Sequence, residues 1–205
     1  MPKLPIFLTS MLSYYSTESV MRFILLLLFS FFSTQLFALS GEQLVKDARS
    51  QIGTTLFYDP AYTKLTYPMG DIPMIKGVCT DVVIRALRKQ GMDLQKLIHE
   101  DMQKHFSQYP KKWGLKKTDK NIDHRRVPNI ATYFKRKGYE IKTDKFQRGD
   151  IVTWDLGRGI THIGIISDKK SGDIPLVIHN IGYGTQENNI LYNFKITGIF
   201  RIPSK

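Results

Sequence analysis

The sequence of 205 residues is poor in cysteine. Cys79 is its single thiol, which excludes an internal disulfide and any zinc or iron–sulfur site built from several cysteines. The chain also lacks internal repeats and heptad arrays, so repeat and coiled-coil architectures are excluded. Hydrophobic residues make up 42% of the chain and aromatic residues 12%, enough for a buried core, which excludes a disordered chain. This length fits one domain with a short additional segment.

A long apolar run occurs near the N-terminus, at residues 23–32. Arg22 precedes it and Ala38 offers a small residue for cleavage, the pattern of a secretory signal peptide. We predict a signal peptide over residues 1–38, with Met21 as an alternative start, and a single domain over 39–205. Since the run is shorter than the ~20 residues of a membrane span, the domain is expected free in the periplasm, without a stable span. An uncleaved segment that tethers it to the membrane is the alternative.

Acidic residues are scarce, with 18 Asp and Glu against 30 Lys and Arg, and the chain after residue 38 keeps a net charge of +11. A basic exported protein meets no nucleic acid, so the expected partner is peptidoglycan or another anionic envelope polymer. A cluster of lysines around Trp113 either binds such a polymer or forms a solvated surface. Solubility alone is the alternative explanation of the charge.

The pattern of apolar residues changes along the chain. Apolar spacing and capping residues predict helices over residues 40–51, 79–89, 93–107 and 128–137. Short β-branched runs separated by Gly, Asp and Pro predict antiparallel strands over residues 151–154, 162–167, 176–180 and 194–202. Residues 54–78 are rich in Gly, Pro, Tyr and Asp and are predicted to be a loop. Helices followed by strands indicate the α+β class.

Cys79 opens the second predicted helix, where the partial positive charge of the helix end favours the thiolate, the nucleophilic form of the side chain. His162 opens one apolar strand and His179 ends the next. A hairpin between these strands, through Asp168 to Pro175, would bring the two imidazoles together. One histidine would then accept the thiol proton and the second would orient it. A buried packing cysteine and two unrelated core histidines are the alternative interpretation.

The segment Gly77-Val78-Cys79-Thr80-Asp81 resembles the nucleophile helix of NlpC-type and CHAP-type cell-wall cysteine peptidases. Residues 149–154 and 162–165 resemble two strands of those enzymes, and Ile178-His179 resembles the strand that carries their third catalytic residue. The mature chain also resembles the YijF-like exported proteins, a domain of unknown function, and residues 121–129 belong to that likeness. The resemblance implies a papain-like fold in which N-terminal helices pack on a small antiparallel sheet, with no metal or cofactor.

The sequence departs from the peptidase pattern before His162, where residues 92–145 insert a largely helical, basic segment. This insertion can cover the cleft or rebuild it. The expected substrate-binding residues are Tyr58, Asp81, Arg125, Arg126 and Asn180. The two arginines fit a stem-peptide carboxylate, because a guanidinium binds a carboxylate with two parallel hydrogen bonds. A loop held by pairing of these arginines with Asp123 remains equally open.

The expected function is hydrolysis of an amide or peptide bond, in peptidoglycan stem peptides, by Cys79, His162 and His179. A non-catalytic envelope-binding module on the same fold is one alternative. A thiol acyltransferase is the other, since it differs only in whether water or an amine reaches the acyl-enzyme.

Overall fold

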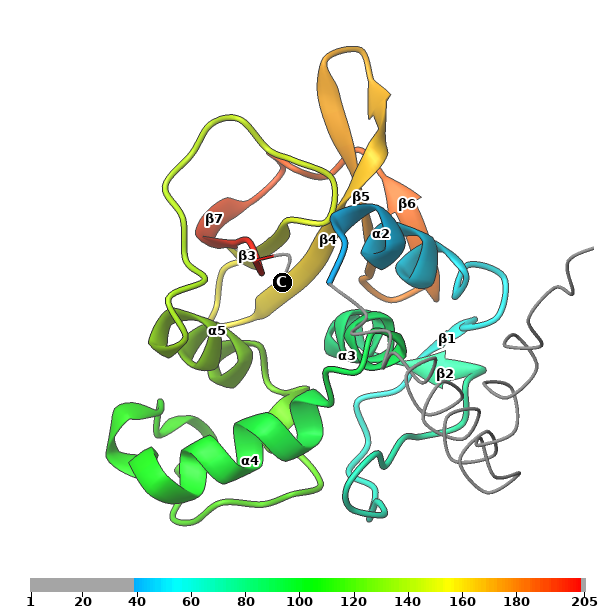
Figure 1. The fold of residues 1–205 in the computed structure, drawn as a ribbon. Coiled ribbons are helices and arrows are strands. Elements are labelled where there is room, and N and C mark those ends of the chain that lie inside the picture. The colour runs from blue at the N-terminus through cyan, green and yellow to red at the C-terminus, as the bar shows by residue number, and fades with distance from the viewer. Residues whose placement is uncertain (1–38, 204–205) are drawn as a thin grey trace, which may run out of the picture. The chain divides into compact units, whose positions relative to one another are not determined.

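The structure, a computed structural model, describes residues 39–203. Its elements confirm the α+β class, with helices first and the main sheet later (Figure 1). The α-helices of this part of the chain are α2 (Gly41–Arg49), α3 (Cys79–Lys89), α4 (Leu94–His105) and α5 (Val127–Arg136). Between α4 and α5 lie the 3-10 turns η1 (Phe106–Gln108), η2 (Lys112–Gly114) and η3 (Asp123–Arg125). The strands of the main sheet are β3 (Ile151–Asp155), β4 (Thr161–Ser171), β5 (Ile174–Asn180), β6 (Thr185–Asn188) and β7 (Lys195–Phe200).

The main sheet has the order β6-β5-β4-β3-β7, and every neighbouring pair is antiparallel. Strands β4 and β5 form the predicted hairpin, with Ile165 opposite Ile178 and Ser171 opposite Ile174. The segment predicted as a loop contains a small parallel pair, β1 (Phe57–Tyr58) and β2 (Lys76–Gly77). Strands of two residues carry no periodicity, so the sequence pattern missed them.

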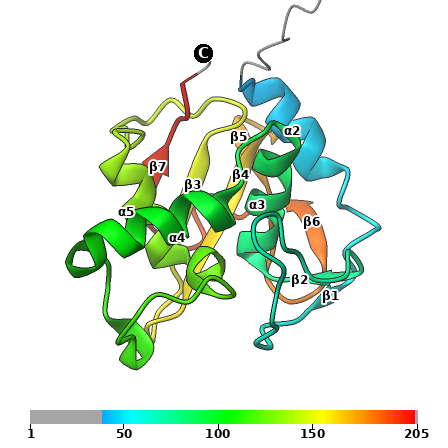
Figure 2. The ribbon, with the colours of Figure 1, turned by 60° about the horizontal axis from the view of Figure 1, so that its bottom comes forward.

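The sheet separates two apolar cores, as expected from the alternation of side chains along a strand. Helices α3, α4 and α5 lie on one side of the sheet (Figure 2). Their core joins helix residues such as Leu87, Ile98 and Phe134 to the sheet residues Ile163 and Ile165. A smaller core on the opposite face contains Val152, Trp154, Ile166, Val177 and Leu191. His162 and Trp154 are partners across β3 and β4, so His162 belongs to the sheet face of this smaller core.

Helix α3 is the central helix, and every residue from Cys79 to Leu87 is buried. Three of these residues are polar, and burial without partners would be unfavourable. Thr80 Oγ1 donates to the Arg125 carbonyl at 3.2 Å. Asp81 and Arg85 form ion pairs with residues from other segments. The buried polar groups of α3 therefore determine which loops pack around its N-terminal half.

Local chemistry accounts for the helix ends. The side chain of Ser40 accepts a hydrogen bond from the Gln43 N–H at 3.4 Å, which confirms Ser40 as the N-cap of α2. Pro128 lies in the first turn of α5, where its missing N–H is not needed. The predicted signal peptide, residues 1–38, lies outside the described residues. Within those residues, each helix is too short or too polar to cross a bilayer.

Gly164 allows β4 and β5 to approach beside the histidines. A Cβ atom at this position would lie 2.6 Å from Val177 Cγ1, 3.1 Å from the Ile178 carbonyl oxygen and 3.2 Å from His179 Cβ. The first of these contacts is closer than folded structures tolerate, so β5 would have to shift. Glycine here therefore sets the position of His179 relative to β4.

We predict that Gly164→Ala destabilises the fold by about 1–3 kcal/mol, the usual penalty of overpacking a close-packed interior. Urea denaturation followed by circular dichroism measures the change. Lys170→Ala is the matched control, because Lys170 is exposed on the same strand. Equal unfolding midpoints for the two variants would show that the strands have room for the methyl group.

Candidate functional site

Cys79 lies in a pocket with a volume of about 140 Å³. Its walls come from three parts of the chain: the β1 region, the start of α3 and the segment between η2 and α5. The lining residues are Tyr58, Pro60, Val78, Cys79, Trp113, Ile122, Arg125, Arg126, Val127 and Thr161. Five of them belong to the segment 92–145, so this segment supplies half of the residues that line the pocket of the thiol.

Cys79 is the first residue of α3, as predicted, and its side chain is 4% exposed. Burial raises the pKa of the thiol to about 12, while the backbone N–H groups of Ile163, Thr80 and Cys79 itself oppose the rise. The expectation of a stable thiolate at the helix end is therefore wrong for this resting site, because desolvation outweighs the helix dipole. The Ile163 N–H lies close enough to the sulfur to favour its ionised form, and Ile163 follows His162 in β4.

The two histidines lie together as the hairpin predicted. His162 Nε2 is 3.1 Å from His179 Nδ1, and the rings meet edge to face with centroids 5.1 Å apart. The ring of Trp154 lies 5.7 Å from that of His162, on the opposite strand. Since Nε2 of His162 is engaged, Nδ1 is the ring atom that remains for a proton acceptor role.

Burial fixes the protonation of this pair. It lowers the pKa of His162 to about 3, with a smaller contribution from His179, and lowers the pKa of His179 to about 4. Both rings are therefore neutral at pH 7, and one proton bridges Nε2 of His162 and Nδ1 of His179. When His162 donates this proton, its Nδ1 is a free base and His179 carries its proton on Nε2. His179 Nε2 is buried without a hydrogen-bond partner among the described residues.

Asp81 and Arg125, two expected substrate ligands, bind each other instead. Arg125 Nε and Nη2 donate to the two Asp81 oxygens, each at 3.0 Å, and both side chains are less than 5% exposed. Asp81 also accepts the Val78 N–H at 2.7 Å and so caps α3. The partner of Arg125 is therefore not Asp123, the residue that the sequence suggested.

The remaining donors of Arg125 reach the segment that carries Tyr58. Nη1 donates to the Ala61 carbonyl and Nη2 to the Asp59 carbonyl, each at 3.2 Å. With all of these donors used, Arg125 holds the pocket wall in place and is not free to bind a substrate carboxylate. Tyr58 faces the thiol pocket as expected, and burial raises its pKa to about 12, so it remains a hydrogen-bond donor.

Arg126 differs from its neighbour. Its guanidinium carbon lies 4.7 Å from the centroid of the Trp113 ring, within the range of a cation–π contact. Its Nη1 is buried and has no hydrogen-bond partner among the described residues. Of the five expected substrate ligands, Arg126 and Tyr58 keep groups directed to the pocket. The sequence indicates Trp113 only as part of a basic loop, since no periodicity in that loop distinguishes a residue that lines a pocket.

Asn180, at the end of β5, is fully buried and contacts the segment that precedes Cys79. Its Nδ2 donates to the Gly77 carbonyl at 3.1 Å, and its Oδ1 accepts from the Gly182 N–H at 3.2 Å. Both ends of the amide are used, so Asn180 positions the segment before Cys79 rather than binding substrate.

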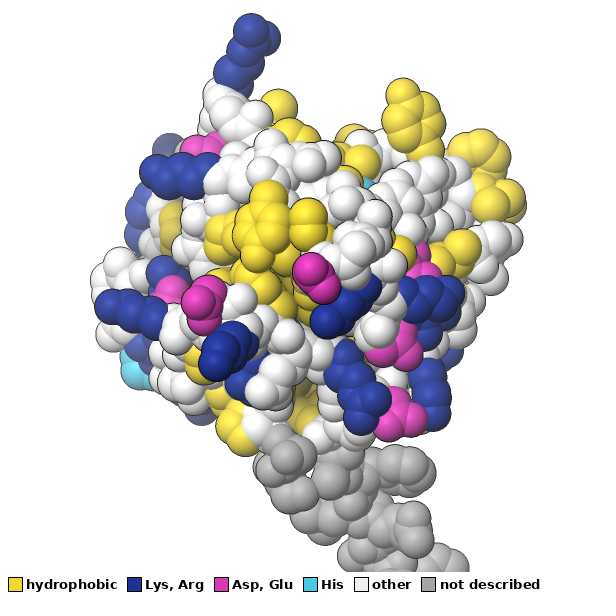
Figure 3. All heavy atoms as spheres, turned by 90° about the horizontal axis from the view of Figure 1, so that it is seen from above, with side chains coloured by type: hydrophobic (Ala, Val, Ile, Leu, Met, Phe, Trp, Pro, Cys, Tyr) yellow, Lys and Arg dark blue, Asp and Glu magenta, His cyan; other side chains and the backbone are white. Residues whose placement is uncertain are grey.

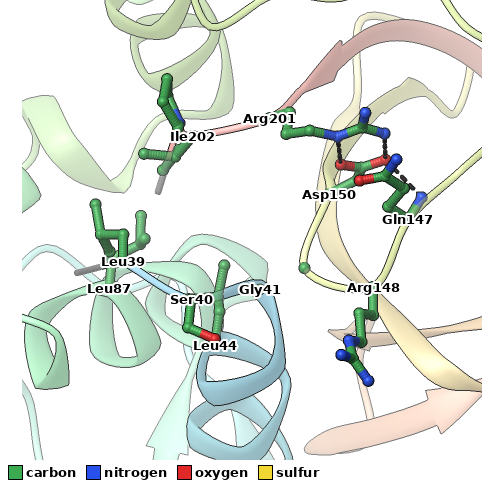
Figure 4. A pocket seen from close by; sticks show the side chains of 12 residues that line it. Leu39, Ser40, Gly41, Leu44, Leu87, Gln147, Arg148, Asp150, Arg201 and Ile202 are labelled. Carbon is green, nitrogen blue, oxygen red and sulfur yellow. Dashed lines mark hydrogen bonds and ion pairs between the residues drawn. The ribbon is translucent and has the colours of Figure 1, made fainter. Parts of the chain in front are cut away.

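A second pocket, with a volume of about 220 Å³, lies away from the thiol, between the first turn of α2, residues 147–150 and residues 201–203 (Figure 4). Arg201 donates from Nε and Nη2 to the two Asp150 oxygens at 2.7 and 2.8 Å, and the Gln147 N–H donates to Asp150 Oδ2 at 2.8 Å. Asp150 of the Gly149-Asp150 motif thus joins the start of β3 to the end of β7. This motif has a structural role.

Charge on the surface is mixed on the face shown in Figure 3, where Lys and Arg side chains alternate with Asp and Glu around a central group of apolar side chains. Such a distribution gives no field of one sign on that face. The positive net charge is therefore not gathered there into a polyanion-binding surface.

Comparison with known proteins places the whole pocket inside one family. Residues 45–202 match the family described as "Domain of unknown function (DUF1287)". "Uncharacterized protein YijF" of Escherichia coli (strain K12) is 58% identical over 159 residues, which cover 75% of this chain and 78% of that protein. These matches confirm the resemblance to YijF-like proteins. The matched range contains Cys79, both histidines and every residue that lines the thiol pocket.

We predict that Asp81→Ala lowers the free energy of unfolding by about 3–5 kcal/mol, because it leaves Arg125 buried without its counter-charge. Asp81→Ala combined with Arg125→Ala should lose less than the sum of the single changes, and chemical denaturation of all three variants measures this coupling. Glu42→Ala, which breaks an exposed pair with Lys46, is the control and should leave the midpoint unchanged. Additive losses would mean that the two side chains act independently.

Three buried histidines predict loss of stability in acid. Burial lowers the pKa of His124 and His162 from 6.5 to about 3, and that of His179 to about 4. As the pH falls below 6.5, these histidines bind protons in the unfolded chain but stay neutral in the folded chain. The free energy of unfolding therefore decreases by about 1.4 kcal/mol per pH unit for each histidine. Denaturation between pH 7.5 and 5 measures this slope, and His124→Gln should reduce it by about a third. A flat profile over this range would contradict the burial of neutral imidazoles.

Proposed function

The chain belongs to the DUF1287 family, and we propose that it is an exported cysteine hydrolase that cleaves an amide or peptide bond in peptidoglycan stem peptides. The observation that carries the proposal is the hydrogen-bonded pair of His162 and His179, with its free Nδ1, on the strand whose Ile163 N–H meets the Cys79 sulfur. The β4 backbone next to His162 thus lies beside the sulfur, and the imidazole pair lies on the other face of the same strand.

The chemistry follows from these groups. The Cys79 S–H proton passes to Nδ1 of His162 as the sulfur attacks the carbonyl carbon, and the backbone N–H of Cys79 stabilises the resulting oxyanion. The intermediate collapses, the C–N bond breaks, and the amine leaves with the proton from His162. Water then attacks the thioester, its proton passes to His162, and cleavage of the C–S bond returns that proton to the sulfur. His179 keeps His162 in the tautomer that this sequence needs.

The resting site must change before this reaction. The His162 imidazole lies on the sheet face that carries Trp154, and neither histidine lines the pocket of Cys79, so the imidazole and the sulfur must be brought together before a proton can pass. Cys79 and His162 form no hydrogen bond with each other among the described residues, and the high pKa of the buried thiol disfavours the thiolate. Catalytic hydrogen bonds commonly tighten only in the complex with substrate. The proposed enzyme therefore forms its nucleophile when a substrate fills the pocket, rather than storing a thiolate–imidazolium pair.

The papain-like, NlpC-type fold is part of the same proposal. Support comes from the order of elements, with the thiol at the start of a central helix and the histidines on two neighbouring antiparallel strands. Export to the periplasm is supported by the signal-like pattern of residues 1–38. Peptidoglycan is then the accessible polymer that is rich in amide bonds.

A non-catalytic envelope-binding module is the second candidate. The observation in its favour is the burial of Cys79, which is 4% exposed and has a raised pKa, as expected for a packing residue. Two unreactive histidines would then be retained for structure only.

We predict that the protein releases amine-bearing fragments from purified peptidoglycan and that Cys79→Ala abolishes this release. His162→Ala should lower the rate by about 10²–10⁴-fold, the usual contribution of a general base. Mass spectrometry of the soluble fragments measures both effects. His124→Gln is the matched control, since it removes a buried histidine outside the pocket and should keep the activity.

The comparison has a clear contrary outcome. Equal release by the parent protein and Cys79→Ala would reject the hydrolase and favour the binding module. Addition of a small amine during the reaction separates hydrolysis from acyl transfer, because a transferase would join the acyl group to that amine.

A further inference from the structure

Arg126 is the charged side chain in the thiol pocket that lacks a counter-charge. No ion pair within residues 39–203 involves it, whereas Arg125 is neutralised by Asp81. Its guanidinium is held against the face of Trp113, and Nη1 is buried without a partner. A buried arginine N–H without an acceptor is unfavourable unless a ligand accepts its hydrogen bond.

The surroundings of Arg126 add to its positive charge. Two helices begin at this pocket, since Val78 and Cys79 open α3 while Arg126 and Val127 open α5. Helix N-termini carry a partial positive charge. None of the ten lining residues has a carboxylate. Asp119 feels the charge of Arg126, but its oxygens are bound by the Tyr62 hydroxyl and by the backbone N–H and side-chain amide of Asn121.

The donors and walls of the pocket favour a carboxylate ligand over a phosphate. A phosphate group needs several strong donors for its three oxygens and its greater charge. The pocket offers one guanidinium without a counter-charge, that of Arg126, and most of its other walls are apolar or aromatic. Such walls fit the carbon skeleton of an amino acid whose carboxylate meets Arg126.

We propose that Arg126, supported by Trp113, forms a carboxylate-binding subsite beside Cys79, so that the substrate carries a free carboxylate next to the amide bond that is cut. This inference deepens the proposed function and rests on Cys79 as the nucleophile for its substrate claim. The carboxylate can belong to the acyl side or to the amine side of the amide bond that is cut.

The first experiment probes the subsite without any catalysis. Cys79 is the single cysteine, so alkylation by iodoacetate and by iodoacetamide reports on this pocket alone. The two reagents differ in a carboxylate and a neutral amide. At pH 9, Arg126→Gln should lower the ratio of the iodoacetate rate to the iodoacetamide rate by about 10-fold, the effect of one charge-assisted hydrogen bond. Arg126→Lys should recover part of the ratio.

Arg148→Gln is the matched control, because it removes an exposed arginine that lines the other pocket. It should leave the ratio unchanged, and circular dichroism should show that all variants fold. The same ratio in Arg126→Gln and in the parent would overturn the subsite. Failure of both reagents to reach Cys79 in the folded protein would overturn it as well, since the pocket would then admit no ligand to the sulfur.

The second experiment uses pairs of synthetic isopeptides that differ in one group, a free carboxylate or its carboxamide, on the acyl side or on the amine side of the scissile bond. The parent should prefer one carboxylate peptide by about 10-fold or more in kcat/KM, and Arg126→Gln should abolish that preference. Cleavage without any such preference would overturn the inference and leave the hydrolase standing. An Arg126-dependent alkylation ratio with no cleavage of any peptide would reject the hydrolase and retain the subsite.

Discussion

The ion pair of Asp81 and Arg125 is the interaction on which the rest of the site depends. Through Asp81 it caps the helix that carries Cys79, and through the other donors of Arg125 it holds the carbonyls of Asp59 and Ala61 beside Tyr58. The same pair draws η3 of the inserted segment against the start of α3. Buried pairs of this kind contribute little net stability but strongly disfavour other arrangements of the same segments. Here the pair fixes three walls of one pocket.

Sequence patterns correctly predicted the features that depend on interactions between residues close together in the sequence. The bounds of α3, the N-cap at Ser40 and the β4–β5 hairpin follow from apolar spacing, capping and turn residues, and the hairpin was enough to predict that His162 and His179 meet. The partner of Arg125 was not predictable in this way, since Asp81 lies 44 positions away and Asp123 is its neighbour in sequence. The pKa of the Cys79 thiol depends on burial by residues from several segments, which a short sequence motif does not indicate. Helix position alone therefore gave the wrong direction for its pKa.

The motifs that resemble those of cell-wall peptidases do not form the thiol pocket alone, because segment 92–145 also lines it. Those motifs contain Cys79 and the histidines, whereas segment 92–145 supplies five of the ten residues that line the thiol pocket, Trp113 and Arg126 among them. In the proposed enzyme, the reacting groups and the walls that select a substrate thus come from separate parts of the chain. Nε2 of His179 and Nη1 of Arg126 are buried without a hydrogen-bond partner among the described residues, and an unsatisfied donor destabilises a fold by about 1–3 kcal/mol.

The long sequence separations within the pocket also bear on how the protein folds. Asn180 reaches Gly77 across 103 positions and Arg125 reaches Asp59 across 66. Contacts of such range form late, after the local helices and the hairpin, because closing large loops is entropically slow. During synthesis the sulfur of the nascent polypeptide is thus open to oxidants and to other thiols, and it becomes shielded only once the distant segments have packed around it.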